Sequence, residues 1–348
     1  MNDNNIISKL DAIGWGDWIL SQGDRAGYLQ TNAWAQTNAI LYNRDSFVVE
    51  MTSGQNRLAG ALCILHRFEE KTRGSVLGDG TLNCHDGPVF DVGLAPERYY
   101  ELVEKIVALG LKLRVREIVI KPGLGTPENE NLAHNFAAYG FTTKSWLTSI
   151  VDLTQDEEVI FQRFRRSVRK SIRKCEASEI EVMICKSFEE QLADFILPYF
   201  ETTPEKMPNV DRLRENWQST QCNYYNYFIA KDKAGVVLAV LGTYHYNGMV
   251  TEIASHRTKA SYGVNLPVQD LLHWEIMKFH KARGDQYFDL AGYSPDPQTP
   301  KEQGIRAFKE KWGGREINIS TYTKDLSPLW FRIARKIKNL IRDSSKQK

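Results

Sequence analysis

Asp289 and Lys309 are the residues of this sequence whose types and settings best suit chemistry. Asp289 lies in the apolar strand pattern Tyr287–Leu290, and polar side chains in such a pattern often border a ligand. Its carboxylate could orient an attacking amine or accept its proton, or it could cap the turn that follows. Lys309, beside Phe308, could hold phosphates or stabilise an oxyanion, or it could lie on a solvated helix face next to Glu310.

A dense run of cations lies between residues 163 and 174, with seven Lys and Arg in twelve positions. Like charges at helical spacing repel one another, so an anion facing them would stabilise the segment. A tRNA backbone or a diphosphate would suit this surface. The expected contacts are Arg166, Arg169, Lys170 and Arg173. The alternative is a solvated helix that pairs with the acidic residues following it.

The C-terminal segment Leu329–Arg342 has an apolar face with basic residues interspersed. A basic amphipathic helix can lie on an anionic membrane. More commonly, such a stripe packs on its own domain. Both alternatives predict a helix, and the first also implies peripheral contact with the membrane.

Bulk composition limits the classes of protein that fit. A chain of 348 residues has about the length of two domains, and 42% hydrophobic with 25% charged residues is ordinary for a globular protein. The net charge of +2 means that binding to nucleic acid or membrane would depend on local patches. Five cysteines without a C-x-x-C pair argue against a disulfide framework, and the first twenty residues lack a signal-peptide pattern. We therefore expect a cytoplasmic protein, peripheral at the inner face of the membrane if its C-terminal helix binds lipid.

No metal ion or cofactor is expected. The seven histidines show no metal-ligand spacing, and Cys84 and His85 are adjacent without obvious partners. No G-x-S-x-G, P-loop or Rossmann fingerprint occurs in the sequence. A reaction on this chain would therefore use neither a serine nucleophile of that type nor a dinucleotide.

One order of elements occurs twice along the chain. Each half has two β segments around a turn, then an amphipathic helix, a strand, and a short helix before a glycine. The first half has Phe47–Met51, Leu58–His66, a helix over 99–107, Glu117–Ile120 and Asn131–Tyr139. The second has Tyr227–Lys231, Val236–Tyr246, a helix over 268–279, Gln286–Leu290 and Gly304–Trp312. This is the order of the GNAT (acyl-CoA N-acyltransferase-like) fold, so we predict an α+β protein of two tandem GNAT-like domains, each a mixed sheet flanked by helices.

A long helix from Glu157 to about Cys175 is predicted to join the halves. Thr154-x-x-Glu157 fits a capping box at its start. The predicted domains are 1–153 and 154–326, the second including this basic helix, with a separate amphipathic helix at 327–348.

The most specific signature lies between residues 287 and 314. A D-x-x-G strand end at Asp289–Gly292 precedes Gly304-Ile-Arg-Ala-Phe-Lys-Glu-Lys-Trp-Gly313. This pair of segments resembles the Fem family of aminoacyltransferases, which build peptidoglycan interpeptide bridges from aminoacyl-tRNA. Segments 28–34, 86–89 and 140–176 also resemble family motifs and follow in the right order.

The resemblance implies a set of functional residues. The catalytic residues would be Lys309, Asp289 and Phe308. The substrate-binding residues would be Trp34, Glu252, Gly292 and Tyr293. Several positions depart from the bridge-forming enzymes, such as Ala35–Asn38 without the usual lysine and Glu201–Lys206 without the usual arginine. The resemblance therefore supports the fold and the reaction class more than it supports a peptidoglycan acceptor.

The segment Arg257–Gly263 occupies the position where a GNAT acetyltransferase carries R/Q-x-x-G-x-G/A. That motif offers backbone N–H groups to the pyrophosphate of coenzyme A. Here Ala260 and Tyr262 replace the two glycines, which argues against acetyl-CoA as the donor.

Three functions follow from these observations. The first is transfer of an aminoacyl group from aminoacyl-tRNA to an amine of a cell-envelope precursor, which needs alignment and oxyanion stabilisation but no covalent enzyme intermediate. The second is N-acylation of an amino sugar in polysaccharide biosynthesis by an acyl-CoA. The third is non-catalytic binding on a GNAT scaffold, because a fold does not fix a function.

Overall fold

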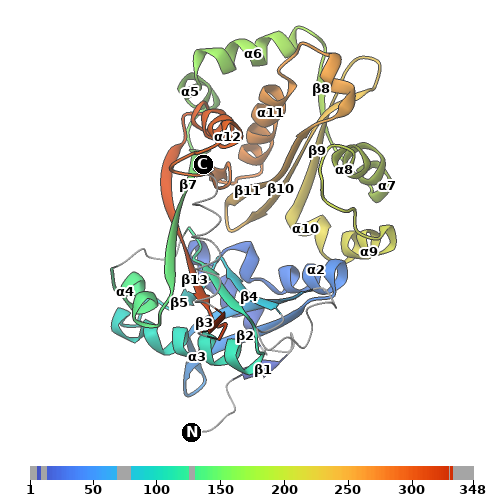
Figure 1. The fold of residues 1–348 in the computed structure, drawn as a ribbon. Coiled ribbons are helices and arrows are strands. Elements are labelled where there is room, and N and C mark those ends of the chain that lie inside the picture. The colour runs from blue at the N-terminus through green and yellow to red at the C-terminus, as the bar shows by residue number, and fades with distance from the viewer. Residues whose placement is uncertain (1–5, 9–13, 69–79, 125–129, 329, 332–348) are drawn as a thin grey trace, which may run out of the picture. The chain divides into compact units, whose positions relative to one another are not determined.

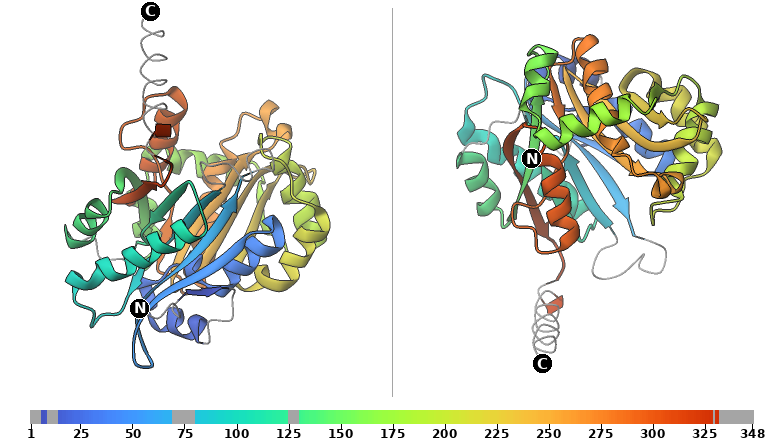
Figure 2. Two further views of the ribbon diagram at one scale, coloured as in Figure 1. Left: turned by 60° about the horizontal axis from the view of Figure 1, so that its bottom comes forward. Right: turned by 90° about the horizontal axis from the view of Figure 1, so that it is seen from above.

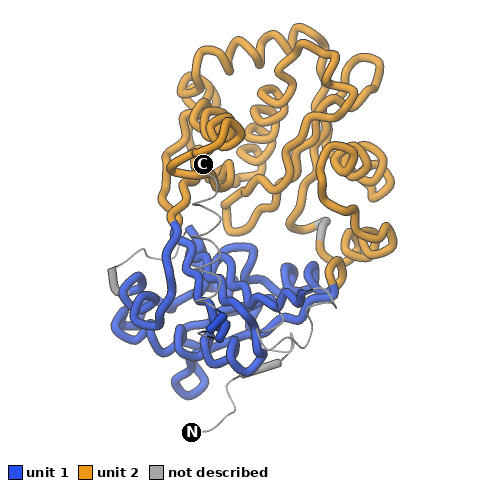
Figure 3. The backbone as a smooth tube through the Cα atoms, in the orientation of Figure 1, with its two compact units in different colours: residues 1–39, 43–144, 320–348 blue, residues 40–42, 145–319 orange. Residues whose placement is uncertain are grey.

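The structure is a computed structural model that describes residues 6–8, 14–68, 80–124, 130–328 and 330–331. The chain divides into two compact units, unit 1 with residues 1–39, 43–144 and 320–348, and unit 2 with residues 40–42 and 145–319 (Figure 3). Strands β7 (Thr142–Asp152) and β13 (Arg315–Asp325) each run from one unit into the other. The divisions between the units therefore fall within these two strands, and not at the predicted domain boundary after Leu153.

Unit 1 contains a mixed sheet. Its strands are, in spatial order, β1 (Ile6–Ser8), β2 (Asp45–Ser53), β3 (Asn56–Arg67), β4 (Gly80–His85), β6 (Glu117–Lys121) and the end of β13, with β5 (Val89–Phe90) pairing with β3 (Figure 1). Only β4 and β6 pair in parallel among these strands. The helices are α1 (Trp15–Ser21), α2 (Asn32–Tyr42), α3 (Tyr99–Lys112) and α4 (Glu130–Ala138). The first-half elements predicted from the sequence are thus confirmed, with ends shifted by a few residues.

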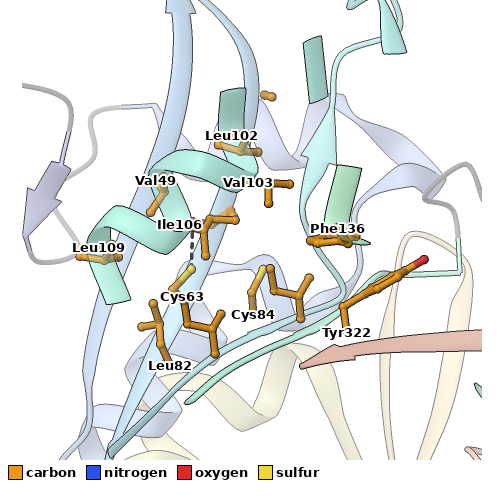
Figure 4. Packing of buried hydrophobic residues seen from close by; sticks show 14 of the residues in the cluster. Val49, Cys63, Leu82, Cys84, Leu102, Val103, Ile106, Leu109, Phe136 and Tyr322 are labelled. Atoms are coloured by element: carbon orange, nitrogen blue, oxygen red, sulfur yellow. Dashed lines mark hydrogen bonds between the residues drawn. The ribbon is translucent and has the colours of Figure 1, made fainter. Parts of the chain in front are cut away.

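The core of unit 1 lies between α3 and the sheet. Leu102, Val103, Ile106 and Leu109 recur at helical spacing on α3 and point toward strand residues that include Val49, Cys63 and Leu82 (Figure 4). Helix α4 adds Phe136, whose ring stacks on Tyr322 of β13 at 4.1 Å between centroids. Each such buried side chain stabilises the fold by roughly 1.5–3 kcal/mol.

The strands of unit 2 also pair in a mixed pattern. They are, in spatial order, the end of β7, then β12 (Tyr287–Asp289), β11 (Met249–Arg257), β10 (Val237–Tyr246), β9 (Tyr225–Lys231) and β8 (Glu181–Ile184). Strands β11 and β12 pair in parallel, and the other neighbours pair antiparallel. The predicted second-half elements are confirmed as well.

Helices cover both faces of the unit 2 strands. Alternate residues of a strand point to opposite sides, so a single strand contributes side chains to two cores. Phe228 and Ala230 of β9 pack in one core with α5 (Glu157–Arg163), α6 (Arg166–Glu176), α11 (Val268–Ala282) and α12 (Pro300–Glu310). Tyr227 and Ile229 pack in another core with α7 (Phe188–Glu190), α8 (Leu197–Phe200), α9 (Val210–Asn216) and two π-helical segments, Gln191–Ile196 and Trp217–Gln221. The short α10 (Cys222–Tyr224) leads into β9. Figures 1 and 2 show α11 in orange and α7 to α9 in yellow-green on opposite sides of these strands.

The predicted continuous helix from Glu157 to Cys175 is wrong, because it breaks at Phe164 and Arg165. Both residues are extended, with ψ angles of 145° and 143°. The Phe164 ring packs edge-on against Trp274 and Trp312, at 5.3 and 5.0 Å between centroids. The break is therefore made by contacts with residues distant in the sequence, which helical periodicity does not report. The predicted capping box is also absent, since the Thr154 hydroxyl donates to Asp152.

Candidate active site

A pocket of about 420 Å³ in unit 2 lies where α12 meets β11 and α11. We call it the Lys309 pocket. Its lining residues are Glu252, Ser255, His256, Arg257, Gln269, Lys301, Gly304, Ile305, Phe308 and Lys309. Three of the residues predicted from the sequence therefore meet in one place, namely Glu252, Phe308 and Lys309.

Helix α12 presents Phe308 and Lys309 to the pocket, and its two ends are fixed by local sequence. At the start, Thr299 Oγ1 accepts from the Glu302 backbone N–H at 3.2 Å, and the Glu302 carboxylate accepts from the Thr299 N–H at 2.9 Å. At the end, Gly313 has φ 65°, and a Cβ on it would lie 2.5 Å from the Arg163 carbonyl oxygen. A glycine is needed at this position both for its backbone conformation and for the close approach.

Lys309 is only 9% exposed, so it does not lie on a solvated helix face. Its Nζ donates to the carbonyl oxygens of Leu290 and Ala291, at the end of β12. These bonds fix the ammonium at the pocket wall. A buried charge of this kind is tolerated only when it is hydrogen-bonded or paired.

Asp289 is 7% exposed and does not line the pocket. Its Oδ1 accepts from the Thr148 hydroxyl and from the Ala291 backbone N–H, the latter at 2.9 Å. Ala291 has a φ of 63°, so the carboxylate stabilises a turn in which a side chain is uncommon. This geometry matches the turn-capping alternative for Asp289.

A bulge in β11 orients the polar wall of the pocket. Ile253 has no partner in the β10–β11 register, where Thr243 pairs with Glu252 and Gly242 with Ala254. In a regular strand, residues 252 and 255 would point to opposite faces. With the extra residue, both point to α11, since Glu252 contacts His273 and Ser255 contacts Gln269.

Glu252 is paired with a histidine that our sequence interpretation missed. Glu252 Oε2 lies 3.2 Å from His273 Nε2, and His273 Nδ1 lies 2.7 Å from the Gln269 carbonyl oxygen. The imidazole is fully buried and contacts the rings of Phe308 and Trp312, both at 5.1 Å between centroids. The available signal was a histidine within the apolar face of a predicted helix.

Two further polar side chains complete the wall. The Ser255 hydroxyl donates to Gln269 Oε1 at 3.3 Å, while Gln269 Nε2 is buried without a hydrogen-bond partner among the described residues. An unsatisfied buried amide is costly, so this N–H group could serve a ligand. His256 lies near Thr202, and burial lowers the pKa of its imidazole, which keeps it neutral at neutral pH.

A second pocket, of about 890 Å³, lies beside α6, and we call it the basic pocket. It is lined by Ser167, Lys170, Ser171, Arg173, Lys174, Arg257 and Val264 to Pro267. Arg257 lines both pockets, so they adjoin. Of the predicted anion contacts, Lys170 and Arg173 are thus in the lining. Arg166 and Arg169 are not, and Arg169 donates instead to the Gln162 carbonyl at 2.9 Å.

The loop between β11 and α11 uses its own backbone groups. Within the 3₁₀ helix Lys259–Gly263 and its ends, the Ser261 N–H donates to Thr258 and the Val264 N–H donates to Ser261, at 3.1 and 3.0 Å. The Arg257 guanidinium also donates to the Ser261 carbonyl at 2.7 Å. These amides are therefore not presented to a pyrophosphate in this conformation.

The remaining predicted site residues lie elsewhere. The Tyr293 hydroxyl donates to the Glu316 carboxylate, and burial raises the pKa of this phenol. Gly292 precedes it in the chain, and neither residue lines a described pocket. Trp34 belongs to α2 of unit 1, where its ring packs edge-on against Tyr28.

Within the described ranges, no group of three or more His, Cys, Asp or Glu side chains could hold a metal ion, and no helix has the length and apolarity to cross a bilayer. The predicted helix over 329–342 lies outside the described residues, apart from Trp330 and Phe331.

Comparisons with known proteins place this fold. No family model and no curated protein matches the sequence. Among solved structures, FemX is similar over 90% of this chain and 96% of its own, at 12% identity and a TM-score of 0.66. L-PGS from Bacillus licheniformis (91% and 93% covered, 12% identity) and a tandem GNAT protein from the clavulanic acid biosynthesis pathway (93% and 98%, 11%) both have TM-scores of 0.57. The predicted fold is thus confirmed, and the chain has the tandem GNAT fold found in these structures.

Proposed function

We propose that this protein is an acyltransferase that moves an aminoacyl group from aminoacyl-tRNA to an amine of a cell-envelope precursor. One observation carries the proposal. The Lys309 pocket, with a buried ammonium and a carboxylate in its wall, adjoins a basic pocket through Arg257. A reaction centre beside an anion site suits a donor whose reactive ester is attached to a phosphate chain.

The pocket contains groups suited to aminolysis of an ester. The amine attacks the ester carbonyl, a C–N bond forms and the ester C–O bond breaks. Lys309 Nζ and Gln269 Nε2 are positioned as donors to the oxyanion that develops in between. Glu252 is the base in the wall, taking a proton from the amine nitrogen and returning it to the departing hydroxyl oxygen. Asp289, bound within its turn, is left with a positioning role.

The donor is aminoacyl-tRNA in this proposal because the basic pocket offers side chains rather than backbone amides. Lys170, Arg173 and Lys174 come from one helix, and the Ser261 and Val264 amides of the neighbouring loop are already bonded within it. The likeness to FemX, and to a domain of a putative lysylphosphatidylglycerol synthetase (13% identity, 90% of each chain covered, TM-score 0.55), supports aminoacyl transfer by analogy of fold.

Acyl-CoA is the alternative donor, for N-acylation of an amino sugar. The observation in its favour is the fold shared with the clavulanic acid pathway protein, whose solved structure is described as the form without AcCoA. This alternative uses the same amine nucleophile and the same Lys309 pocket. It would replace only the ligand of the basic pocket.

The test is retention of charged tRNA by the purified protein on filters, at two salt concentrations, with coenzyme A as competitor. Salt-sensitive binding that coenzyme A does not displace is expected, because phosphate contacts release counterions. Saturable binding of acyl-CoA without tRNA binding would replace the proposal with the alternative. Tight binding to an envelope component, without turnover of either donor, would indicate a non-catalytic binding protein.

A further inference from the structure

His273 has a setting that packing alone does not require. It lies on α11, its side chain is fully buried, and its ring stacks on Trp312 with an interplanar angle of 23°. An apolar residue would fill this space without an unpaired polar atom. The imidazole instead joins Glu252, in the wall of the Lys309 pocket, to the Gln269 backbone.

The hydrogen-bond partners fix where the protons are. The Gln269 carbonyl oxygen can only accept, so His273 Nδ1 must carry a hydrogen atom. His273 Nε2 and Glu252 Oε2 are 3.2 Å apart, and both would present lone pairs if neither were protonated. A hydrogen atom must therefore lie between them if this contact is a hydrogen bond.

We propose that His273 is a positioning residue that keeps Glu252 oriented and ready to accept the proton of the attacking amine. The inference rests on the proposed function. Glu252 Oε2 is held by His273, while Glu252 Oε1 has no hydrogen-bond partner among the described residues. Oε1 takes the proton as the amine N–H bond breaks, and the same proton passes to the ester oxygen that leaves. Glu252 and His273 thus return to their starting protonation state, and the step needs no further reactant.

Helix α11 also supplies a matched control. His280, seven residues later, is equally buried and has its own carboxylate partner, with Nδ1 2.8 Å from Asp285 and Nε2 3.1 Å from the Thr243 hydroxyl. Neither His280 nor its partners line a described pocket. The two histidines therefore share burial and pairing and differ in access to the Lys309 pocket.

Other charged groups surround the pair and would contribute to any pH profile. Those in the pocket wall or beside it include His256, Arg257, Lys301, Lys309 and the Asp270–Lys311 ion pair, and α11 and α12 also carry the Glu275–Lys278 and Arg306–Glu310 pairs. These groups are unchanged when only position 273 is replaced. A change specific to His273→Gln would thus report on Glu252.

The experiment compares His273→Gln with His280→Gln in a transfer assay over a range of pH. We expect His273→Gln to lower kcat by about 100-fold with little change in KM, and to change the pH profile of kcat, because Glu252 loses the hydrogen bond that holds its Oε2. His280→Gln should keep the kcat of the folded protein and its profile. Equal effects of the two changes would overturn the inference while leaving transfer itself intact.

A second measurement tests the hydrogen bonds of His273 in the wild-type protein and does not depend on transfer activity. In ¹⁵N-histidine spectra of the wild-type protein, Nδ1 of His273 should carry the hydrogen atom that it donates to the Gln269 carbonyl oxygen. Assignment uses Glu252→Gln, which should perturb the Nε2 resonance of His273 alone. An unprotonated Nδ1 would overturn the inference, even if no donor supported transfer and the proposed function had failed.

Discussion

The two units have the same order of elements, but they differ in the residue buried near the end of the second helix of each unit's motif, α4 or α12. Helices α4 and α12 both stop before a glycine in the left-handed region, Gly140 with φ 74° and Gly313 with φ 65°. Four residues before each glycine stands the residue that the helix buries against its sheet. In unit 1 this is Phe136, which is 0% exposed, and in unit 2 it is Lys309, at 9%.

The matching central helices of the two units, α3 and α11, differ in the same way. The buried face of α3 is apolar, with Leu102 and Ile106 at its centre. The buried face of α11 includes Asp270, His273 and His280. Burying such groups costs free energy unless each is hydrogen-bonded, so their presence is typical of a functional site. Unit 1 also buries polar groups, such as Gln30, but the face that α3 turns to the sheet is apolar.

The largest expected effect is on stability in unit 1. Phe136→Ala removes a ring from a filled core and should lower the free energy of unfolding by about 3–5 kcal/mol. Chemical denaturation measures this loss. Transfer activity per folded molecule should be unchanged, and a selective loss of activity would contradict the assignment of chemistry to unit 2.

Lys309→Met is the matched change in unit 2. Methionine keeps the apolar stem and removes the ammonium, so the protein should remain folded while kcat falls by about 100- to 1,000-fold. Circular dichroism and steady-state kinetics together separate the two effects. A variant that unfolds would point to the carbonyl contacts of Leu290 and Ala291 as the main role of Lys309.

The basic pocket should set donor affinity. The double change Lys170→Ala with Arg173→Ala should weaken charged-tRNA binding by about tenfold at moderate salt, and lower the magnitude of the salt slope by about one to two. Lys112→Ala, in the last turn of α3 in unit 1, is the control. An unchanged slope in the double variant would make α6 an ordinary solvated helix.

The smallest effect concerns a histidine of unit 1 and appears only in acid. Burial lowers the pKa of His85 from 6.5 to about 4. The unfolded chain therefore binds a proton that the folded protein excludes, and stability that is full above pH 6.5 declines as the pH falls toward 4. His85→Gln should flatten this decline by about 1–2 kcal/mol at pH 5 without changing transfer at neutral pH. Parallel curves of unfolding free energy against pH would refute this assignment.

Much of the fold could be predicted because its signals are local. The periodic apolar residues of α3 and the apolar runs on either side of the turns in the β2–β3 and β9–β10 hairpins are readable in short windows. The break at Phe164 was not predictable, since its cause is a contact with Trp274 and Trp312, over a hundred residues away. The passage of β7 and β13 from one unit to the other was not predictable either, because it depends on strand pairing between residues far apart in the sequence.

The candidate site was predicted in part, through the resemblance of Phe308 and Lys309 to a family motif. The hydrogen bonds of Asp289 could not be foreseen, because its partner Thr148 belongs to another strand. Glu252 was named without its partner His273, which depends on a bulge at Ile253 that no residue type signals. Contacts between side chains of different strands and helices are therefore the part of the site that the sequence alone does not predict.

The central claim is that unit 2 transfers an aminoacyl group at the Lys309 pocket. Its most direct test is transfer of radiolabelled amino acids from a pool of charged tRNA to an amine-bearing envelope fraction, by the wild-type protein and by Lys309→Met. The account predicts salt-sensitive transfer by the wild type that coenzyme A does not inhibit, and near-complete loss in the variant. Consumption of acyl-CoA without transfer from tRNA, or full transfer by Lys309→Met, would contradict it.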